Sequence, residues 1–576
     1  MITSPFVPRV YLPADVDLAS TGSLGLVYGR LAVDLAAAGT VAELVAGLGC
    51  YGEVECALDQ VRSERHIAMT CQTDDVERER AYLHFVEVVD PWLKPRQFAL
   101  WQALVAHPAF GALPDYYAVF RRSVVTSVKL YREGNVPRET EQAKLSQNYQ
   151  KVCGAMTVVF EGQERTLAQM GRVQEETDRS RRRLAWEAVA ARRLADKEKL
   201  EEVFDSLLSV RGEMAAEAGF ADYRAYMFEA KERFDYSPED CLRFHEAIEK
   251  HVVPLARELQ EQRRSQLGLG KEPLRPWDLA VDALGRAPLQ PFTTGAELFE
   301  KTEAIFAEVD PRLADWFGVL KEGGLIDLEN RKGKAPGGYQ ATLAEARVPF
   351  IFMNAVGMQR DVETLLHEAG HAFHALACRS QPLFAYRGGI PLEFCEVASM
   401  AMELFGAPGL EKFYSPAEAK RARRDHLEGI IKFFPWMAIV DGFQHWIYTH
   451  PGHSREERKE AWLALMDRFG GIEDWSGLGE LEEARGYLWH RQLHIFEYPF
   501  YYVEYGIAQL GALQVWVKAL ADRKGALDGY LNGLKWGGAK PLPELFSEAG
   551  ISFDFTERTL APLIGRVREE LARLEG

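Results

Sequence analysis

Apolar residues recur at intervals of three and four through most of the chain, within segments that are otherwise rich in charge. This spacing places the apolar side chains on one face of an α-helix. The pattern is almost continuous from Arg165 to Glu229. Because isolated helices are marginal in water, burial of these apolar faces must hold the helices in place. The pattern therefore predicts a mainly helical protein.

Two stretches interrupt the helical pattern. Proline and glycine cluster between Gly268 and Gly295, and breaks recur between Gly323 and Tyr339, which is typical of loops or of connections between lobes. The run Val348 to Met353 (VPFIFM) follows the second break, and four of its six residues are β-branched or aromatic. We expect it to form a short strand in an otherwise helical region.

The chain length implies more than one lobe. At 576 residues it exceeds the size at which a single hydrophobic core stops growing, about 250–300 residues. The hydrophobic content of 47% is sufficient to fill two or three lobes. The formal net charge of −17 argues against nucleic acid or an anionic membrane surface as a partner, since both require basic patches.

Several features favour a cytoplasmic location. The first 18 residues lack a basic region followed by an apolar run, so no secretory signal is expected. No stretch reaches the roughly 18 uninterrupted apolar residues of a membrane span. The seven cysteines are odd in number, scattered and without a Cys-x-x-Cys pair. This distribution favours reduced thiols over a disulfide framework or a cysteine-based zinc finger.

The segment Asp361 to Cys378 (DVETLLHEAGHAFHALAC) carries the strongest chemical signal. We expect a helix over 361–378, with Asp361 as its N-terminal cap. His367 and His371 are four residues apart and therefore lie on one helix face. Two imidazoles in this arrangement can bind one zinc ion at about 2.0–2.1 Å. Glu368 can reach a water on that metal, which is the geometry of a metalloprotease general base.

A third ligand is predicted on a second helix, over Pro391 to Phe405 (PLEFCEVASMAMELF). Glu396 in this helix would complete a set of two histidines and one carboxylate, with one zinc per chain and the fourth position left for water. Glu393 and Glu403 lie on neighbouring turns. Each is either a surface charge or a group that supports a ligand from behind.

His374 is a competing candidate, since it lies three residues after His371. Three ligands from one straight helix rarely converge on one ion, so a packing or supporting role is favoured. A purely structural zinc site is disfavoured for this motif, because such sites fill all four positions with protein ligands, mostly Cys and His.

A third block, His494 to Tyr505 (HIFEYPFYYVEY), is dense in polar aromatic residues. An interface between helices would explain this composition. The tyrosines also repeat at intervals of three and four, so they can face one cleft, where phenol and imidazole donors would suit a developing oxyanion. The four tyrosines are Tyr498, Tyr501, Tyr502 and Tyr505.

These blocks resemble the thimet oligopeptidase and oligoendopeptidase F family of zinc peptidases, in particular its bacterial oligoendopeptidase F branch. The resemblance rests on LLHEAGHAFHALAC, PLEFCEVASMAMELF, PFYYVEYGIA and the GKAPGGY…VPFIFMN arrangement. It implies a mainly α, elongated, two-lobed zincin-like fold with a small β-sheet near the active site. A deep channel would admit peptides, exclude folded proteins and hold zinc at its floor. Residues 1–160 would form an N-terminal helical lobe and residues 161–576 the catalytic region.

The resemblance also implies residue roles. Glu396 would be the third zinc ligand, and Val348 to Met353 would be the sheet edge on which an extended substrate pairs. Gly388 and Gly389 would be either a mobile substrate loop or a plain turn. The family pattern of a histidine followed by tyrosines corresponds best to His494 and two of the tyrosines. These are Tyr501 and Tyr505, with Tyr498 and Tyr502 as alternatives.

The resulting hypothesis is a zinc endopeptidase that cuts internal bonds of short unfolded peptides. A zinc carboxypeptidase or dipeptidyl carboxypeptidase could use the same ligands, but it would need a cationic anchor, for which Arg347, Arg360 and Arg387 are candidates. A peptide-binding protein without catalysis is a third possibility. The intact motif argues against it, because a binding protein has no need of Glu368.

Overall fold

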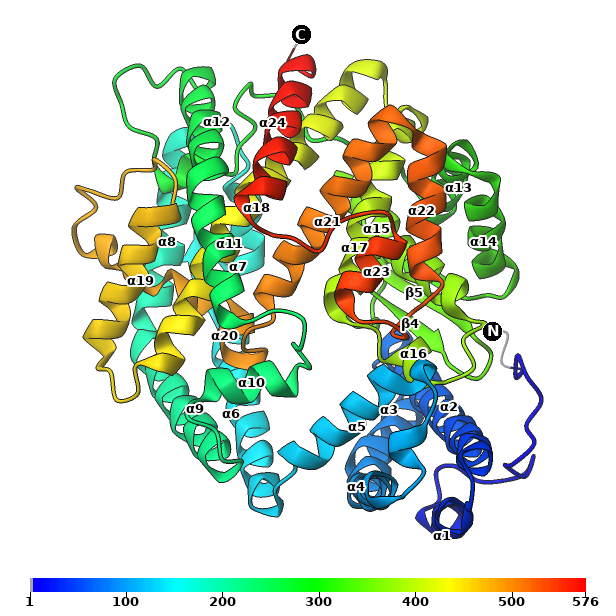
Figure 1. Cartoon of the computed structure of the whole chain (residues 1–576). Helices are drawn as coiled ribbons and strands as arrows, with labels where there is room; N and C mark the ends of the chain where they lie inside the picture. The colour runs from blue at the N-terminus through cyan, green and yellow to red at the C-terminus, as the bar shows by residue number, and fades with distance from the viewer. Residues whose placement is uncertain (1–3, 576) are drawn as a thin grey trace. The chain divides into compact units, whose positions relative to one another are not determined.

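The computed structural model describes residues 4–575, and these residues are mostly α-helical (Figure 1). Five short strands, β1 to β5, accompany the helices in the described part of the chain. The predicted mainly helical fold with a small sheet is therefore confirmed. Among the described residues, no helix is both long enough and apolar enough to cross a membrane.

The described chain packs into two compact units, each assembled from separate segments. Unit 1 contains the chain up to Lys129, Leu289–Arg423 and Ile507–Phe553. Unit 2 contains Leu130–Pro288, Arg424–Gly506 and the chain from Asp554. Each unit is described by itself below. The division into residues 1–160 and 161–576 stays a prediction, as does a channel between two lobes.

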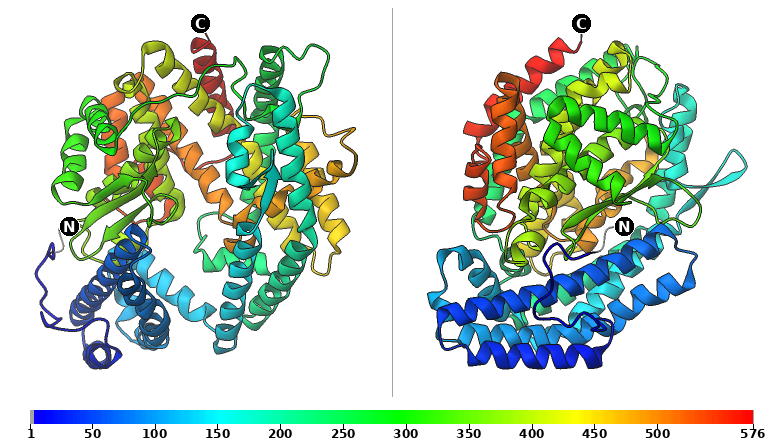
Figure 2. Two further views of the ribbon diagram at one scale, coloured as in Figure 1. Left: turned by 180° about the vertical axis from the view of Figure 1, so that it is seen from behind. Right: turned by 90° about the vertical axis from the view of Figure 1, so that its right-hand side faces the viewer.

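The first helices of unit 1 form a layer in which α1, α2 and α4 lie side by side (Figure 2). Thr40 caps α2 through its side chain and Glu43 returns a hydrogen bond to the Thr40 backbone, which fixes where this long helix begins. Buried leucines such as Leu24, Leu31 and Leu48 fill the core of the layer. The helices are α1 (Thr21–Ala37), α2 (Val41–Cys71), α3 (Val76–His84), α4 (Asp90–Ala106) and α5 (Ala118–Leu130), the last ending at the boundary of the unit.

A three-stranded sheet of unit 1 has the order β3-β5-β4, with β3 spanning Ile326–Glu329, β4 Tyr339–Leu343 and β5 Val348–Ala355. The predicted strand is present as β5, which pairs with β4 in antiparallel and with β3 in parallel fashion. The expectation that this strand is the sheet edge is wrong. All but one of its residues are buried, and its unbroken apolar run is typical of a central strand. The edges are β3 and β4.

Helix α15 (Gln359–Cys378) packs on β5 and against α17 (Leu392–Gly406). It begins two residues before the predicted start. Asp361 lies in its first turn, and its carboxylate accepts the backbone N–H groups of Val356 and Met358 at 2.8 and 2.9 Å. The predicted capping residue therefore satisfies backbone donors from inside the helix. On the buried face, Phe373 contacts Phe306 edge-on, with ring centroids 4.9 Å apart.

The close approach of α15 and α17 depends on Gly370. A Cβ at this position would lie 2.5 Å from the Ala398 carbonyl oxygen and 2.5 Å from Ser399 Cα. Both atoms belong to the backbone of α17 and cannot move aside as a flexible side chain could. The other helices of unit 1 are α13 (Gly295–Val309), α14 (Pro311–Glu322), α16 (Ala385–Gly388), α22 (Arg523–Leu534) and α23 (Leu542–Glu548).

Unit 2 is almost entirely helical, with a hairpin of β1 (Thr157–Phe160) and β2 (Gln163–Thr166) (Figure 2). Its buried Arg211 donates to the Tyr448 hydroxyl at 2.7 Å and to the carbonyl of Ile495 at 3.3 Å, which fixes α20. The helices are α6 (Val136–Gly154), α7 (Leu167–Val173), α8 (Arg179–Ala195), α9 (Lys197–Glu217), α10 (Tyr223–Ala230), α11 (Pro238–His251), α12 (Val253–Gln266), α19 (Arg455–Phe469), α20 (Leu493–Glu497) and α24 (Glu557–Arg573). Helices α18 (Pro416–Thr449) and α21 (Tyr502–Ala521) each belong partly to both units.

Gly370→Ala should destabilise the protein, because the added methyl group forces the α15 and α17 backbones apart. Overpacking of this kind costs about 1–3 kcal/mol, and we expect a lower thermal unfolding midpoint in calorimetry. Gly49→Ala is the matched control, since nothing lies within 4 Å of a Cβ there and the residue is inside α2. The control should be neutral or stabilising by up to about 1 kcal/mol. Equal midpoints for the two variants would contradict the close approach at Gly370.

Candidate metal centre

Two histidines of α15 and one glutamate of α17 come together in unit 1. The rings of His367 and His371 have centroids 4.9 Å apart and are nearly perpendicular. Oε2 of Glu396 lies 3.3 Å from Nε2 of His367 and 3.7 Å from Nε2 of His371. Donor atoms on a tetrahedral zinc, at bond lengths of about 2.0–2.1 Å, are separated by about 3.3 Å. The three side chains are therefore spaced as ligands of one divalent cation, and they are the three that the sequence predicted.

Polar groups behind these side chains orient them. His367 Nδ1 donates to Glu403 Oε1 at 2.7 Å, which leaves Nε2 directed at Glu396. Ser399 Oγ donates to Glu396 Oε2 at 2.9 Å. From the sequence, Glu403 could be either a surface charge or a group that supports a ligand. Its contact with His367 is of the kind that fixes the tautomer and orientation of a ligand.

The protonation of the cluster suits cation binding. Burial lowers the pKa of His371 to about 4, so this imidazole is neutral near pH 7 and keeps a lone pair. Burial acts to raise the pKa of Glu396, but the two histidines outweigh it and lower that pKa, so the carboxylate is ionised. For His367, burial acts to lower the pKa, yet Glu396 and Glu403 raise it well above the ordinary value. A bound cation would take the place of that proton.

Glu368 is buried beside the cluster, with 8% of its surface exposed. Burial raises its pKa to about 7, with partial compensation from His367 and from the backbone N–H of Gln340 on β4. A carboxyl group with a pKa near neutrality can both accept and return a proton at physiological pH. The edge strand β4 thus contacts the residue that the sequence predicted as general base.

His374 lies outside this cluster. Its ring is 2% exposed and contacts Phe394 edge-on, with centroids 5.7 Å apart. Burial lowers its pKa to about 3, so the ring is neutral. These contacts are those of a packed core histidine.

A cavity of about 490 Å³ lies next to the cluster within unit 1. Residues 340–342 of β4 line it together with His371, and three arginines face it: Arg347, Arg379 and Arg387. Two of these were candidate anchors from the sequence, whereas Arg360 is not among the lining residues. Arg379 and Asp59, also in the lining, were missed, because no local pattern distinguishes them from surface charges.

The third predicted block forms an aromatic cluster in unit 2. The ring centroid of His494 lies 4.9–6.3 Å from those of the four tyrosines. Burial lowers the pKa of His494 to about 4. Gln492 Nε2 donates to His494 Nδ1 at 2.7 Å, so the neutral ring carries its proton on Nε2 and can donate it. The metal cluster lies in unit 1, and a role for His494 at that cluster stays a prediction.

The sequence model of peptidase family M3 matches residues 172–563. The chain belongs to peptidase family M3. Oligopeptidase PepF of Bacillus subtilis strain 168 is 26% identical over 251 residues, which cover 42% of this chain and 36% of that protein. The oligoendopeptidase F homolog of Borreliella burgdorferi is 29% identical over 239 residues, which cover 40% of this chain and 38% of that protein. The matched regions thus span well under half of these relatives.

Solved structures resemble this M3 chain over nearly its whole length. A structure of PZ peptidase A with an inhibitor has a TM-score of 0.86 at 30% identity, covering 98% of each chain. A structure provisionally named oligoendopeptidase F, from Bacillus anthracis strain Ames, has a TM-score of 0.82 at 26% identity, covering 97% of each chain. The family resemblance that the sequence motifs suggested is confirmed.

Proposed function

We propose that this M3 family member is a zinc-dependent endopeptidase that hydrolyses internal bonds of short, unfolded oligopeptides. The observation that carries the proposal is the convergence of His367, His371 and Glu396 on one point, with Glu368 buried beside them. Three protein donors meet there among residues 4–575, so a fourth position is left for water, as in catalytic zinc sites. The relatives named oligopeptidase and oligoendopeptidase support the substrate class.

The donor set fits zinc, because a neutral imidazole, a second imidazole held by Glu403 and a carboxylate are ordinary zinc ligands. When bound there, zinc would lower the pKa of a water to about 7 and polarise the scissile carbonyl. Glu368 would take the proton as the water attacks and then deliver it to the leaving amine. Its pKa of about 7 supports both transfers.

The substrate would lie along β4. This strand is at the edge of its sheet, and residues 340–342 line the cavity that His371 also lines. An extended peptide could add to such an edge through main-chain hydrogen bonds. This arrangement would present the scissile carbonyl between Glu368 and the three ligands. It would also favour unfolded peptides, since only an extended chain can pair with the strand.

We assign the donors to the developing oxyanion to the aromatic block His494–Tyr505. His494 is the first candidate, because its neutral ring carries a proton on Nε2. Tyr501 and Tyr505 are the second, with ring centroids 4.9 Å apart and both near His494. Tyr498 and Tyr502 remain the alternatives.

The test of the proposal is cleavage of an internally quenched peptide, with the fragments identified by mass spectrometry. We expect cuts at internal bonds, including in peptides with amidated C-termini, and none in a folded protein. Chelation should abolish the activity and zinc should restore it. Glu368→Gln should lose about 10²–10⁴-fold in kcat while it keeps the wild-type content of bound zinc. Full activity of this variant, or of the chelated enzyme, would rule out the mechanism.

Glu403→Gln should weaken zinc binding without removing a ligand. Loss of a carboxylate behind a ligating histidine typically costs about 10–100-fold in metal affinity or activity, and we expect the affinity to fall in competition with a chromogenic chelator. Saturating zinc should restore most of the activity. Glu411→Gln is a suitable control, because this exposed residue lies in the short helical turn after α17. Unchanged affinity in Glu403→Gln would show that its contact with His367 has no supporting role.

The three arginines that line the cavity favour a second candidate function, cleavage near a free C-terminus. Guanidinium groups recognise carboxylates with paired hydrogen bonds. On this alternative, Arg387→Gln should raise KM for peptides with a free C-terminus about tenfold, the equivalent of one 1.4 kcal/mol contact. KM for amidated peptides should stay unchanged. Arg360→Gln is the matched control, since Arg360 is exposed and outside the cavity lining. Equal effects on both kinds of peptide would eliminate the C-terminal anchor.

A further inference from the structure

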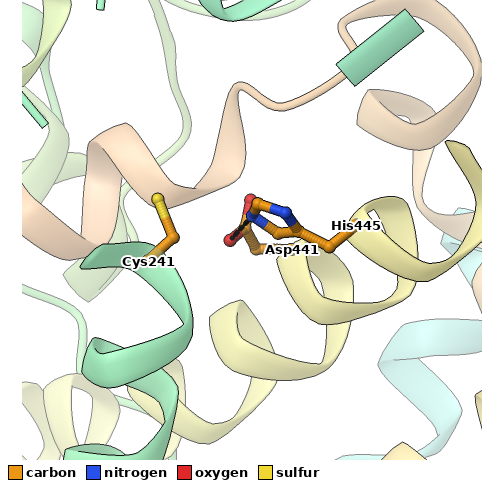
Figure 3. Close-up of side chains that lie close together, drawn as sticks. All are labelled: Cys241, Asp441 and His445. Carbon is orange, nitrogen blue, oxygen red and sulfur yellow. Dashed lines mark ion pairs between the residues drawn. The ribbon is translucent and has the colours of Figure 1, made fainter. Parts of the chain in front are cut away.

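A second group of metal-binding residue types lies inside unit 2, on helices α11 and α18. Cys241 and His245 are four residues apart on α11, and Asp441 and His445 are four residues apart on α18. Each pair therefore lies on one face of its helix. All four residues are at most 3% exposed. Figure 3 draws Cys241 from one helix beside Asp441 and His445 from the other.

Three members of this group, Cys241, Asp441 and His445, are spaced as ligands of one ion, and His245 faces the same carboxylate. Asp441 Oδ2 lies 3.0 Å from Nε2 of His245 and 3.2 Å from Nε2 of His445. The cysteine sulfur and donor atoms of Asp441 and His445 all lie within 4.8 Å of one another. Around tetrahedral zinc, nitrogen and oxygen donors are separated by about 3.3 Å and a sulfur lies slightly farther out, because its bond is about 2.3 Å long.

Polar atoms of Asp441, His445 and His245 lack hydrogen bonds of ordinary geometry. Both carboxylate oxygens of Asp441, both ring nitrogens of His445 and Nε2 of His245 have no hydrogen-bond partner in the described part of the chain. Asp441 is fully buried, and a buried carboxylate is costly unless cationic groups or hydrogen bonds compensate it; here the imidazoles of His245 and His445 face it. Two imidazole nitrogens therefore converge on one carboxylate oxygen at ion-pair distance without a hydrogen bond of good geometry, an arrangement that a shared ion would also produce.

The surroundings are closed and apolar. The His445 ring contacts Phe500 and Phe228, with centroids 5.4 and 6.0 Å away, and the His245 ring contacts Phe469 at 6.4 Å. Such a shell excludes water and strengthens the interaction of a cation with its ligands. A buried cluster in which His245 can add a fourth donor to the other three has the character of a structural site, in contrast to the three-donor centre beside Glu368.

We propose that Cys241, His245, Asp441 and His445 form a second, structural metal site that holds zinc. One sulfur, two nitrogens and one oxygen match the preference of zinc, whereas magnesium and calcium require oxygen ligands. The thiol loses its proton when the ion binds. The ion cross-links α11 to α18, so its binding free energy adds to the stability of unit 2. This proposal does not depend on the proposed peptidase activity.

The first test is the metal content of the purified full-length protein by inductively coupled plasma mass spectrometry. We expect two zinc ions per chain in the wild type and one in His445→Ala or Cys241→Ser. His371→Ala, which breaks the other centre, should also retain one. Cys56→Ser is the matched control, because Cys56 is another buried cysteine, on α2 of unit 1, and it should retain two. A single ion that disappears in His371→Ala and persists in both unit 2 variants would overturn the proposal.

Cobalt substitution gives a readout that a misfolded variant cannot imitate, because only the unit 2 site includes a cysteine. The cobalt-loaded wild type should show a thiolate-to-cobalt charge-transfer band in the near ultraviolet. The band should persist in His371→Ala and Cys56→Ser and vanish in Cys241→Ser. Its absence from the cobalt-loaded wild type would refute a cysteine ligand, and Asp441 would then be a metal-free partner of the two histidines.

Stability provides a third, independent readout. In the His371→Ala background, a strong chelator should lower the thermal unfolding midpoint, and added zinc should restore it. The same chelator should not shift the midpoint of the His371→Ala/Cys241→Ser double variant. Equal shifts in the two proteins would contradict a stabilising ion at this site.

Discussion

The contact between α15 and α17 at Gly370 is the constraint on which the candidate catalytic centre depends. Two donors come from one helix and the third from the other, so the separation of the helix axes decides whether the three meet. A Cβ at Gly370 would lie 2.5 Å from the α17 backbone, and the helices therefore approach as closely as their main chains allow. At this separation Glu396 Oε2 comes within 3.3 and 3.7 Å of the two histidine nitrogens. Glu403, further along the same helix, reaches His367 from the other side.

This close packing brings an electrostatic cost that the centre must offset. Glu368 and Glu396 are both buried carboxyl groups, and burial of an ionised carboxylate without partners is expensive. Glu396 is compensated by two imidazoles and by Ser399. The cost of burying Glu368 is offset less by neighbouring groups, and burial raises its pKa to about 7. Because their environments differ, Glu396 stays ionised whereas Glu368 can exchange a proton. Hydrolysis requires both kinds of carboxyl group.

The sequence predicted the local parts of this arrangement and failed on the non-local ones. The motif around His367 and His371 could be recognised because its geometry lies within one helix, and the apolar run of β5 marked a strand. The place of β5 in the sheet was mistaken, because neither β3 nor β4 carries a pattern that shows that it pairs with β5 and makes it the central strand. The capping role of Asp361 was correct in kind, although the helix begins earlier. Arg379 and Asp59 went unnoticed, because only the packing of separate segments makes them neighbours.

The two clusters of metal-binding residue types also show that sequence patterns reveal local geometry and miss contacts between distant segments. Each combines residues four apart on one helix with residues from a second helix, so their local geometry is equivalent. Only the first has a glutamate between its histidines, and that glutamate turns the spacing into a recognisable motif. The pair of Cys241 and His245 has no such signature, and its partner pair lies about two hundred residues away along the chain. Phenylalanine rings enclose the second cluster, which suits a site that holds an ion permanently. A cavity lies beside the first cluster, which suits a site that carries out a reaction. That distinction follows from the surroundings of the donors together with the cysteine, which the second cluster has and the first does not.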